Sequence, residues 1–149
     1  MNYLSTGFAQ AVTVGDLIVG DMADRRLVEE VLRTHAIDAV RTAWEIQEFM
    51  AEEARRRARS GRPMWELRIG INTGPLMAGV IGHKKFAYDI WGDTVNIAAR
   101  LESAGAAGRI NLSRTTYDEV RGAFRCTPRG RLPVKNADPV EMFFVDGVA

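Results

Sequence analysis

The chain has 149 residues, of which 46% are hydrophobic and 26% charged, so it can bury the core of one ordinary globular domain. Its formal charge of +1 gives no reason to expect nucleic acid or an anionic membrane as partner. The sequence shows no apolar run long enough to cross a bilayer and no signal-peptide pattern. A single cysteine, Cys126, cannot form an internal disulfide, and we interpret it as a small, partly buried side chain rather than a reactive thiol. We therefore expect a cytoplasmic protein without a membrane segment.

Residues 1–33 form a divergent N-terminal segment. The stretch 8–19 is apolar and β-leaning, and its interruption at Val14-Gly15-Asp16 is typical of a hairpin turn. Residues 22–33 then carry mixed charge, with apolar residues at helical spacing (Leu27, Val28, Val31 and Leu32). This segment predicts a hairpin followed by a short helix, set before a main domain at 34–149.

A long helix is predicted from Thr34, whose hydroxyl can accept from the free amides of a first turn. A period near 3.6 follows, with one polar interruption, through Ile37, Val40, Trp44, Gln47, Met50 and Ala54. Gly61 and Pro63 end it. The arginine cluster at 55–59 suggests either a polyanion site or a solvated helix face, and the neighbouring glutamates favour the solvated face.

The next segments alternate between strands and turns. Residues 65–72 alternate apolar and polar side chains, which predicts a half-buried strand. A turn at 72–75 leads into a strand at 76–81, and a further strand is predicted at 86–91. Asp93 or Thr94 is expected to cap a helix that runs to about Ala104.

The remainder predicts a strand at 110–112, a helix capped by Ser113 that ends near Gly122, and a closing strand at 140–145. Strands and helices thus mix without a regular βα alternation. That order indicates an α+β fold.

Three polar residues stand together around the third predicted strand and the helix after it. Asn96 and Arg100 lie four residues apart, so both project from one helix face, and Asp89 lies on the strand that feeds this helix. A carboxylate, an amide and a guanidinium near a helix N-terminus suit a phosphate or a ribose. In the alternative interpretation, Asp89 and Arg100 form a structural ion pair and Asn96 satisfies a turn.

The span Arg68 to Ser103, and within it the phrase YDIWGDTVNIAARLES, resembles the class III adenylate/guanylate cyclase catalytic domain. The resemblance covers about Thr34 to Ala149. It implies the class III nucleotidyl cyclase fold with a ferredoxin-like βαβ core and conversion of ATP to 3′,5′-cyclic AMP and pyrophosphate. It further implies that Asp89 selects adenine, that Asn96 orients the ribose, and that Arg100 stabilises charge on the α-phosphate.

The resemblance also implies a lysine on the terminal phosphates and two Mg²⁺ or Mn²⁺ ions held by two aspartates. Lys135 matches the lysine, although Asn136 and Ala137 depart from the family phrase that follows it. Asp16 is the candidate for one metal ligand, against an ordinary turn aspartate. No counterpart of the first strand, Phe-x-Asp-Ile, is found, so we expect an N-terminally truncated domain with an incomplete metal site.

Active sites of this family form between two subunits, which implies a homodimer or a heterodimer with another cyclase domain. Three interpretations therefore stay open. The chain is an adenylate cyclase domain impaired when alone, a non-catalytic nucleotide-binding or regulatory partner of a cyclase, or a truncated gene product.

Overall fold

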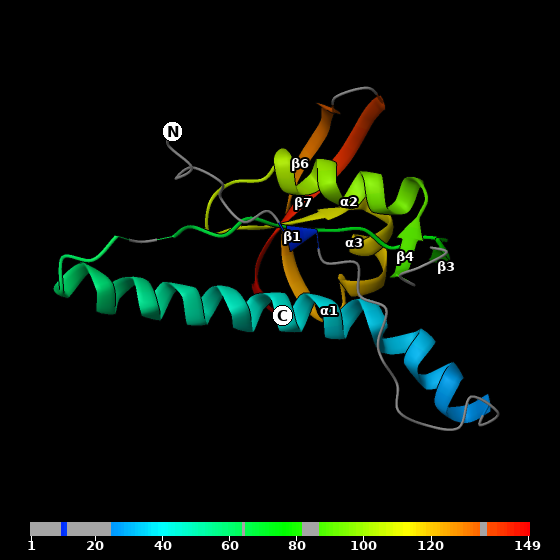
Figure 1. Ribbon diagram of the computed structural model, residues 1–149, viewed down its shortest axis with the longest axis horizontal. Helices are drawn as coiled ribbons and strands as arrows, with labels where there is room; N and C mark the ends of the chain where they lie inside the picture. The colour runs from blue at the N-terminus through cyan, green and yellow to red at the C-terminus, as the bar shows by residue number, and fades with distance from the viewer. Residues whose placement is uncertain (1–9, 12–24, 64, 82–86, 135–136) are drawn as a thin grey trace.

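The computed structural model describes residues 10–11, 25–63, 65–81, 87–134 and 137–149 (Figure 1). Its helices are α1 (Arg25–Arg59), α2 (Asp93–Ser103) and α3 (Arg114–Val120). Its strands are β1 (Gln10–Ala11), β2 (Ile69–Ile71), β3 (Met77–Ile81), β4 (Ala87–Trp91), β5 (Ile110–Ser113), β6 (Phe124–Val134) and β7 (Ala137–Val148). None of the helices in these described ranges is long and apolar enough to span a membrane.

The strands form one five-stranded sheet in the order β1-β2-β5-β7-β6 and a separate β3-β4 hairpin. β1, β2 and β5 run parallel to one another, whereas β7 is antiparallel to both β5 and β6. A mixed sheet of this kind, with helices between some strands and hairpins between others, confirms the predicted α+β class.

Helices cover both faces of this sheet. In Figure 1, α2 lies on one side of the sheet, and α1 with α3 lies on the other. The hydrophobic core is on the side of α1 and α3, where one buried cluster joins α1 to β2, β5 and β7 through residues such as Val40, Ala43, Ile69, Leu112 and Phe143. Tyr117 of α3 stacks on Phe143 with ring centroids 4.0 Å apart.

The helix start predicted at Thr34 is wrong, because α1 begins at Arg25 and passes through Thr34 without a break. The helical spacing noticed upstream belongs to this same helix. Extending an existing helix adds one hydrogen bond per residue, whereas starting a new one requires a costly nucleus. The proposed division between residues 1–33 and 34–149 stays a prediction.

The one polar interruption in the predicted apolar stripe of α1 has a specific partner. The side-chain amide of Gln47 donates to the carbonyl oxygen of Leu67 at 2.9 Å. Gln47 thereby ties α1 to the chain that enters β2, which is why an amide is accepted at this position of the stripe.

The half-buried strand predicted at 65–72 is also wrong in extent and burial. β2 comprises only Ile69–Ile71, and all three of its residues are buried, while Trp65 is 73% exposed. Both faces of β2 are covered because α1 packs on one and α2 on the other. Gly70, counted with the polar face in the alternation, is where α2 comes closest.

The C-terminal elements match the expectations in part. Ser113 caps α3 as predicted, since its hydroxyl accepts from the amide of Thr116. The closing strand is longer than expected and pairs with β6, which the sequence did not predict as a strand. Pro128 and Gly130 lie at a register shift in β6, and such irregularities obscure a strand pattern.

Candidate functional site

The β3-β4 hairpin and α2 carry the predicted nucleotide-reading residues. β4 places Asp89 opposite Gly79 in an antiparallel register, and α2 carries Asn96 and Arg100. Gly92 joins the two elements with φ of 136°, a conformation that disfavours any residue with a Cβ. Strand and helix therefore follow each other through a single residue, so their relative placement is tightly constrained.

The cap predicted at Asp93 or Thr94 is wrong. The N-cap is Gly92, no side chain caps α2, and Asp93 is the first helical residue. The hydroxyl of Thr94 instead donates to the carbonyl oxygen of Pro75, which attaches the first turn of α2 to the loop before β3. No capping side chain therefore accepts a hydrogen bond from the backbone amides in the first turn of α2. Backbone amides without such an acceptor favour the binding of an anion at a helix N-terminus.

Asn96 and Arg100 lie on α2 one turn apart, as the sequence predicted. Asn96 is exposed and Arg100 half-buried, whereas Ala98 and Leu101 of the same helix are buried against the sheet. The structure describes Asp89 by its backbone only. Whether its carboxylate faces a nucleotide or Arg100 therefore stays a prediction.

The buried side of α2 is held by polar contacts as well as by packing. The amide of Asn111, fully buried on β5, donates to the carbonyl oxygen of Leu101 at 2.8 Å. Arg68, next to β2, forms a 2.9 Å ion pair with Glu102, whose side chain is only 6% exposed. Because these contacts fix α2 against the sheet, its outward residues stand on a rigid support.

The C-terminal end of α2 is held by an arginine from β6. Arg129 donates to the carbonyl oxygen of Ala104 at 2.8 Å, and its guanidinium lies 4.1 Å from the ring centroid of Phe144. Burial, and after it the charge of Arg109, lowers the pKa of Arg129. A cation at a helix C-terminus complements the partial negative charge of the last carbonyls.

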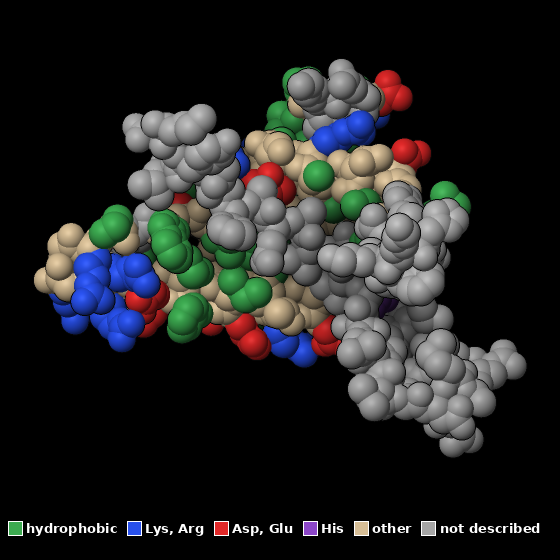
Figure 2. Space-filling view, in the orientation of Figure 1, with side chains coloured by type: hydrophobic (Ala, Val, Ile, Leu, Met, Phe, Trp, Pro, Cys, Tyr) green, Lys and Arg blue, Asp and Glu red, His purple; other side chains and the backbone are tan. Residues whose placement is uncertain are grey.

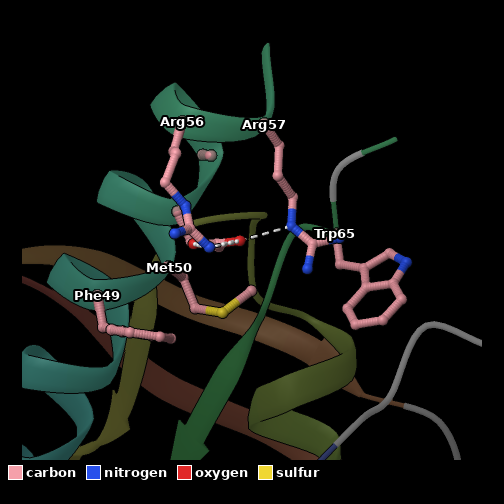
Figure 3. A pocket seen from close by; sticks show the side chains of 7 residues that line it. Phe49, Met50, Arg56, Arg57 and Trp65 are labelled. Atoms are coloured by element: carbon pink, nitrogen blue, oxygen red, sulfur yellow. Dashed lines mark hydrogen bonds and ion pairs between the residues drawn. The ribbon is translucent and has the colours of Figure 1, made fainter. Parts of the chain in front are cut away.

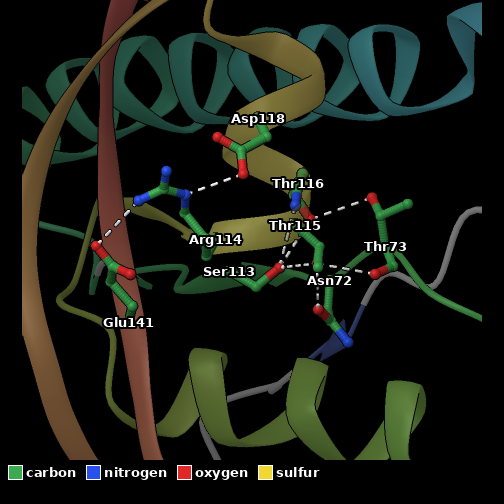
Figure 4. Close-up of polar contacts among 8 residues, drawn as sticks. All are labelled: Asn72, Thr73, Ser113, Arg114, Thr115, Thr116, Asp118 and Glu141. Atoms are coloured by element: carbon green, nitrogen blue, oxygen red, sulfur yellow. Dashed lines mark hydrogen bonds and ion pairs between the residues drawn. The ribbon is translucent and has the colours of Figure 1, made fainter.

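A polar network that the sequence did not predict ties the carboxyl end of β2 to α2 and α3 (Figure 4). The side-chain amide of Asn72 donates to the carbonyl oxygen of Thr94 at 3.0 Å. The Thr115 hydroxyl lies 2.9 Å from the carbonyl oxygen of Thr73 and 3.3 Å from Oδ1 of Asn72, and the hydroxyls of Thr73 and Thr116 are 3.1 Å apart. The network fixes the first turn of α2, next to Asn96.

Replacing Asn72 with alanine should remove the link between β2 and α2. We expect Asn72→Ala to lower the free energy of unfolding by about 1–2 kcal/mol, because the partly buried carbonyl of Thr94 loses its donor. Urea denaturation measures this change. Asn96→Ala is the matched control: the side chain of Asn96 is exposed, so its removal should leave the free energy of unfolding unchanged. Equal effects of the two variants would contradict a stabilising link between Asn72 and Thr94.

Cys126 is half-buried, in agreement with the interpretation as a partly buried side chain. Burial, and after it the charge of Asp146, raises the pKa of the Cys126 thiol. A raised pKa lowers the thiolate fraction at neutral pH, and the thiolate is the reactive form. Alkylation by iodoacetamide at pH 7 should therefore be several-fold slower in the folded protein than in urea, and equal rates would contradict this.

The candidate metal ligand and the candidate phosphate-binding lysine belong to other parts of the chain. Asp16 and Lys135 lie outside the described residues, as does the predicted turn at 14–16. Within the described ranges, no group of three histidine, cysteine, aspartate or glutamate side chains could hold a metal ion. The described side chains thus do not by themselves fit a metal centre, and we derive no step through one.

Comparison with known proteins decides the family. The model of the adenylate and guanylate cyclase catalytic domain matches residues 9–147. This chain belongs to that family. The match begins well before Thr34, so it includes much of the N-terminal segment. Cyclase domains of this class act as dimers on a nucleotide and generally use divalent metal ions.

Curated relatives include cyclases of both substrate types. An adenylate cyclase of Mycobacterium tuberculosis (strain H37Rv) is 38% identical over 87 residues, which are 58% of this chain and 19% of the relative. The soluble guanylate cyclase gcy-34 of Caenorhabditis elegans is 43% identical over 81 residues, 53% of this chain and 12% of the relative. The chain thus spans a fifth or less of each of these proteins.

Solved structures confirm the cyclase fold. The adenylyl cyclase CyaB of P. aeruginosa superposes with a TM-score of 0.69 at 32% identity, covering 74% of this chain and 58% of that one. The guanylate cyclase domain of RhGC from Catenaria anguillulae, in complex with GTP, superposes with a TM-score of 0.67 at 32% identity. The match covers 77% of this chain and 61% of that one. Family and fold are therefore established, and both substrate types occur among the similar proteins.

Proposed function

We propose that this chain is the nucleotide-reading half of a class III adenylate cyclase, converting ATP to 3′,5′-cyclic AMP and pyrophosphate in intracellular signalling. The observation that carries the proposal is the β4-Gly92-α2 unit, which places Asp89 just before a rigid helix bearing Asn96 and Arg100. A homodimer, or a heterodimer with another cyclase domain, completes the site. The choice of ATP rests on Asp89, because both adenylate and guanylate cyclases occur among the similar proteins.

In this proposal each residue acts on one part of the substrate. The ribose 3′-hydroxyl loses its proton to water and its oxygen attacks the α-phosphorus; a new oxygen–phosphorus bond forms, and pyrophosphate leaves with the electrons of the broken bond. Asn96 orients the ribose for this attack, and Arg100 stabilises the negative charge that grows on the α-phosphate. Lys135 is proposed to contact the terminal phosphates and Asp16 to contribute to metal binding.

Asp89 is proposed to read the base. Its carboxylate accepts from the N6 amino group of adenine, whereas guanine presents an acceptor at the same position and would be repelled. Asp89→Ala should therefore narrow the preference for ATP over GTP by about tenfold, the usual value of one charged hydrogen bond. The measurement is the ratio of kcat/KM for the two nucleotides, and an unchanged ratio would remove Asp89 from base reading.

The experiment that tests the function measures cyclic AMP and cyclic GMP formed from ATP and GTP with Mn²⁺. The chain is assayed alone and mixed with a cyclase whose own ribose-orienting asparagine and transition-state arginine have been replaced. Restored activity in the mixture, beyond either protein alone, supports the proposal. No restoration by a chain shown to be folded would overturn it.

A second candidate function is a regulatory partner that binds a nucleotide without turnover. It is favoured by the sequence, in which no counterpart of the family's Phe-x-Asp-Ile strand with its metal aspartate is found. Calorimetry with an unreactive ATP analogue separates the two functions, because binding without any product in the mixed assay is expected only of the regulatory module.

A further inference from the structure

Helix α1 continues well beyond the sheet that supports it. Its 35 residues give a length of roughly 52 Å, and Figure 1 shows its C-terminal part extending past the strands. Gln47 is hydrogen-bonded to Leu67, just before β2, and the apolar stripe continues beyond it through Met50 and Ala54. Phe49, beside this stripe, is 67% exposed, so this part of α1 carries apolar side chains that the core does not cover.

The chain between α1 and β2 folds back beside the C-terminal part of α1 and forms a pocket with it, here called the α1-end pocket (Figure 3). It has a volume of about 250 Å³, with Phe49, Met50 and Ala54 on its helix side and Trp65 on the other. Trp65 is 73% exposed although it belongs to an apolar wall. The hollow is slightly smaller than the roughly 300–1,000 Å³ of small-molecule sites, and suits one large apolar side chain better than a whole ligand.

Two arginines define the polar rim of the pocket. Arg57 donates through Nε to Glu53 at 2.8 Å, and its guanidinium lies 5.3 Å from the ring centroid of Trp65. Arg56 forms a 2.9 Å ion pair with the same glutamate. Since one carboxylate serves two guanidiniums, their remaining N–H groups can donate to acceptors outside the chain.

The surroundings of the pocket are strongly basic although the whole chain is nearly neutral. Residues 52–62 contain five arginines and two glutamates. Figure 2 shows this blue cluster at the end of α1, beside green apolar side chains. Arg59 and Arg62 make no ion pair with another described residue. An occupant with negative charge is therefore favoured over a neutral or basic one.

The composition of the pocket favours a protein occupant. Tryptophan, phenylalanine, methionine and arginine, which line this pocket, are among the residues enriched in protein interfaces. A helix that lies on an anionic membrane presents one apolar face beside a basic one, whereas here Trp65 and Phe49 flank a hollow and Glu53 is paired with both arginines. The hollow and its rim thus fit a side chain with acidic neighbours.

We propose that the α1-end pocket docks an acidic segment of a partner protein, which inserts one large apolar side chain between Phe49 and Trp65 and places carboxylates on Arg56 and Arg57. This surface is built from α1 and the chain before β2, whereas the proposed catalytic residues lie on β4 and α2. The inference therefore stands independently of the proposed cyclase activity.

The test begins with selection of a random 12-residue peptide library on the purified protein. We expect enriched peptides to combine a phenylalanine, tryptophan or leucine with two or more acidic residues, and their binding to weaken as salt is raised. Affinity is then measured by fluorescence anisotropy with one enriched peptide. Trp65→Ala and Arg57→Gln should each weaken binding about 30-fold, the size of an interface hot spot.

Two control variants change similar residues elsewhere. Val148→Ser removes an exposed apolar side chain outside the pocket, and Arg41→Gln removes an exposed arginine from an earlier turn of α1. Neither should alter peptide affinity, and circular dichroism checks that all variants are folded. Trp65→Phe should retain most of the binding, because it keeps an aromatic wall.

Four outcomes would overturn the inference. The first three are enrichment of neutral or basic peptides, equal binding by the protein and its Trp65→Ala variant, and no enrichment accompanied by Trp65-dependent binding to phosphatidylserine vesicles. The third outcome would assign the surface to a membrane. A library that yields no binder at all would equally count against a peptide-docking site.

Discussion

Gly70→Ala is expected to destabilise the fold by about 3 kcal/mol, the upper end of the cost of overpacking a core. Gly70 lies at the centre of β2, beneath α2. A Cβ at this position would overlap the backbone nitrogen of Glu102 and lie 2.6 Å from the carbonyl oxygen of Ala98. Both atoms belong to the helix backbone, so neither can turn aside as a flexible side chain would, and α2 as a whole must move.

Gly122→Ala is the matched control for this prediction. Nothing lies within 4 Å of a Cβ at Gly122, and its φ is not in the left-handed region. Urea denaturation of the two variants and the unchanged protein gives the free energies of unfolding. A loss at Gly70 no larger than that at Gly122 would mean that α2 can shift cheaply, and would weaken the view of α2 as a rigid support.

The role of Gly70 also shows what the sequence could not predict. The period-two alternation at 65–72 identified a strand and its apolar face correctly at Ile69 and Ile71. It assigned the other face of the strand to solvent because Gly70 alternates there with the polar residues Arg68 and Asn72. Burial of that face depends on the approach of α2, whose sequence lies more than twenty residues away, and no local pattern encodes such an approach.

Helix α1 presents a related limit. Its apolar period predicted residues that pack on the sheet, since Val40 is fully buried in the core and Ile37 and Trp44 pack against it. The start was misplaced because a threonine in a helical run has the same local signal as a threonine that caps one. The period alone also gave no sign that the sheet ends before the stripe does.

The candidate site was predictable where its residues are close in sequence. Asn96 and Arg100 share one helix in the structure because a spacing of four places them on the same face whatever the tertiary fold. The network around Asn72 joins residues more than forty positions apart, such as Thr73 and Thr116. In the sequence its members are typical of turns and helix caps. They meet only because β2 and β5 are paired in the sheet, which brings the ends of the two strands together.

Arg100→Ala is expected to lower the rate of cyclic AMP formation by about 10²–10³-fold, the cost of removing one donor from a developing oxyanion. The measurement is made on the chain mixed with a cyclase that lacks its own transition-state arginine, so that Arg100 is the guanidinium under test. Because the proposed interaction strengthens only as charge grows on the α-phosphate, kcat should fall while KM changes little.

The comparison of three variants separates this role from a structural one. Arg100→Lys keeps a positive charge and should recover part of the lost rate, although a lysine cannot reproduce the planar fork of donors. Arg121→Ala removes an exposed arginine at the end of α3 and should leave the rate unchanged. If Arg100→Ala lowered the free energy of unfolding and the rate together, and lysine restored neither, Arg100 would serve the packing of α2. Loss of rate at full stability is instead what a guanidinium facing the α-phosphate requires.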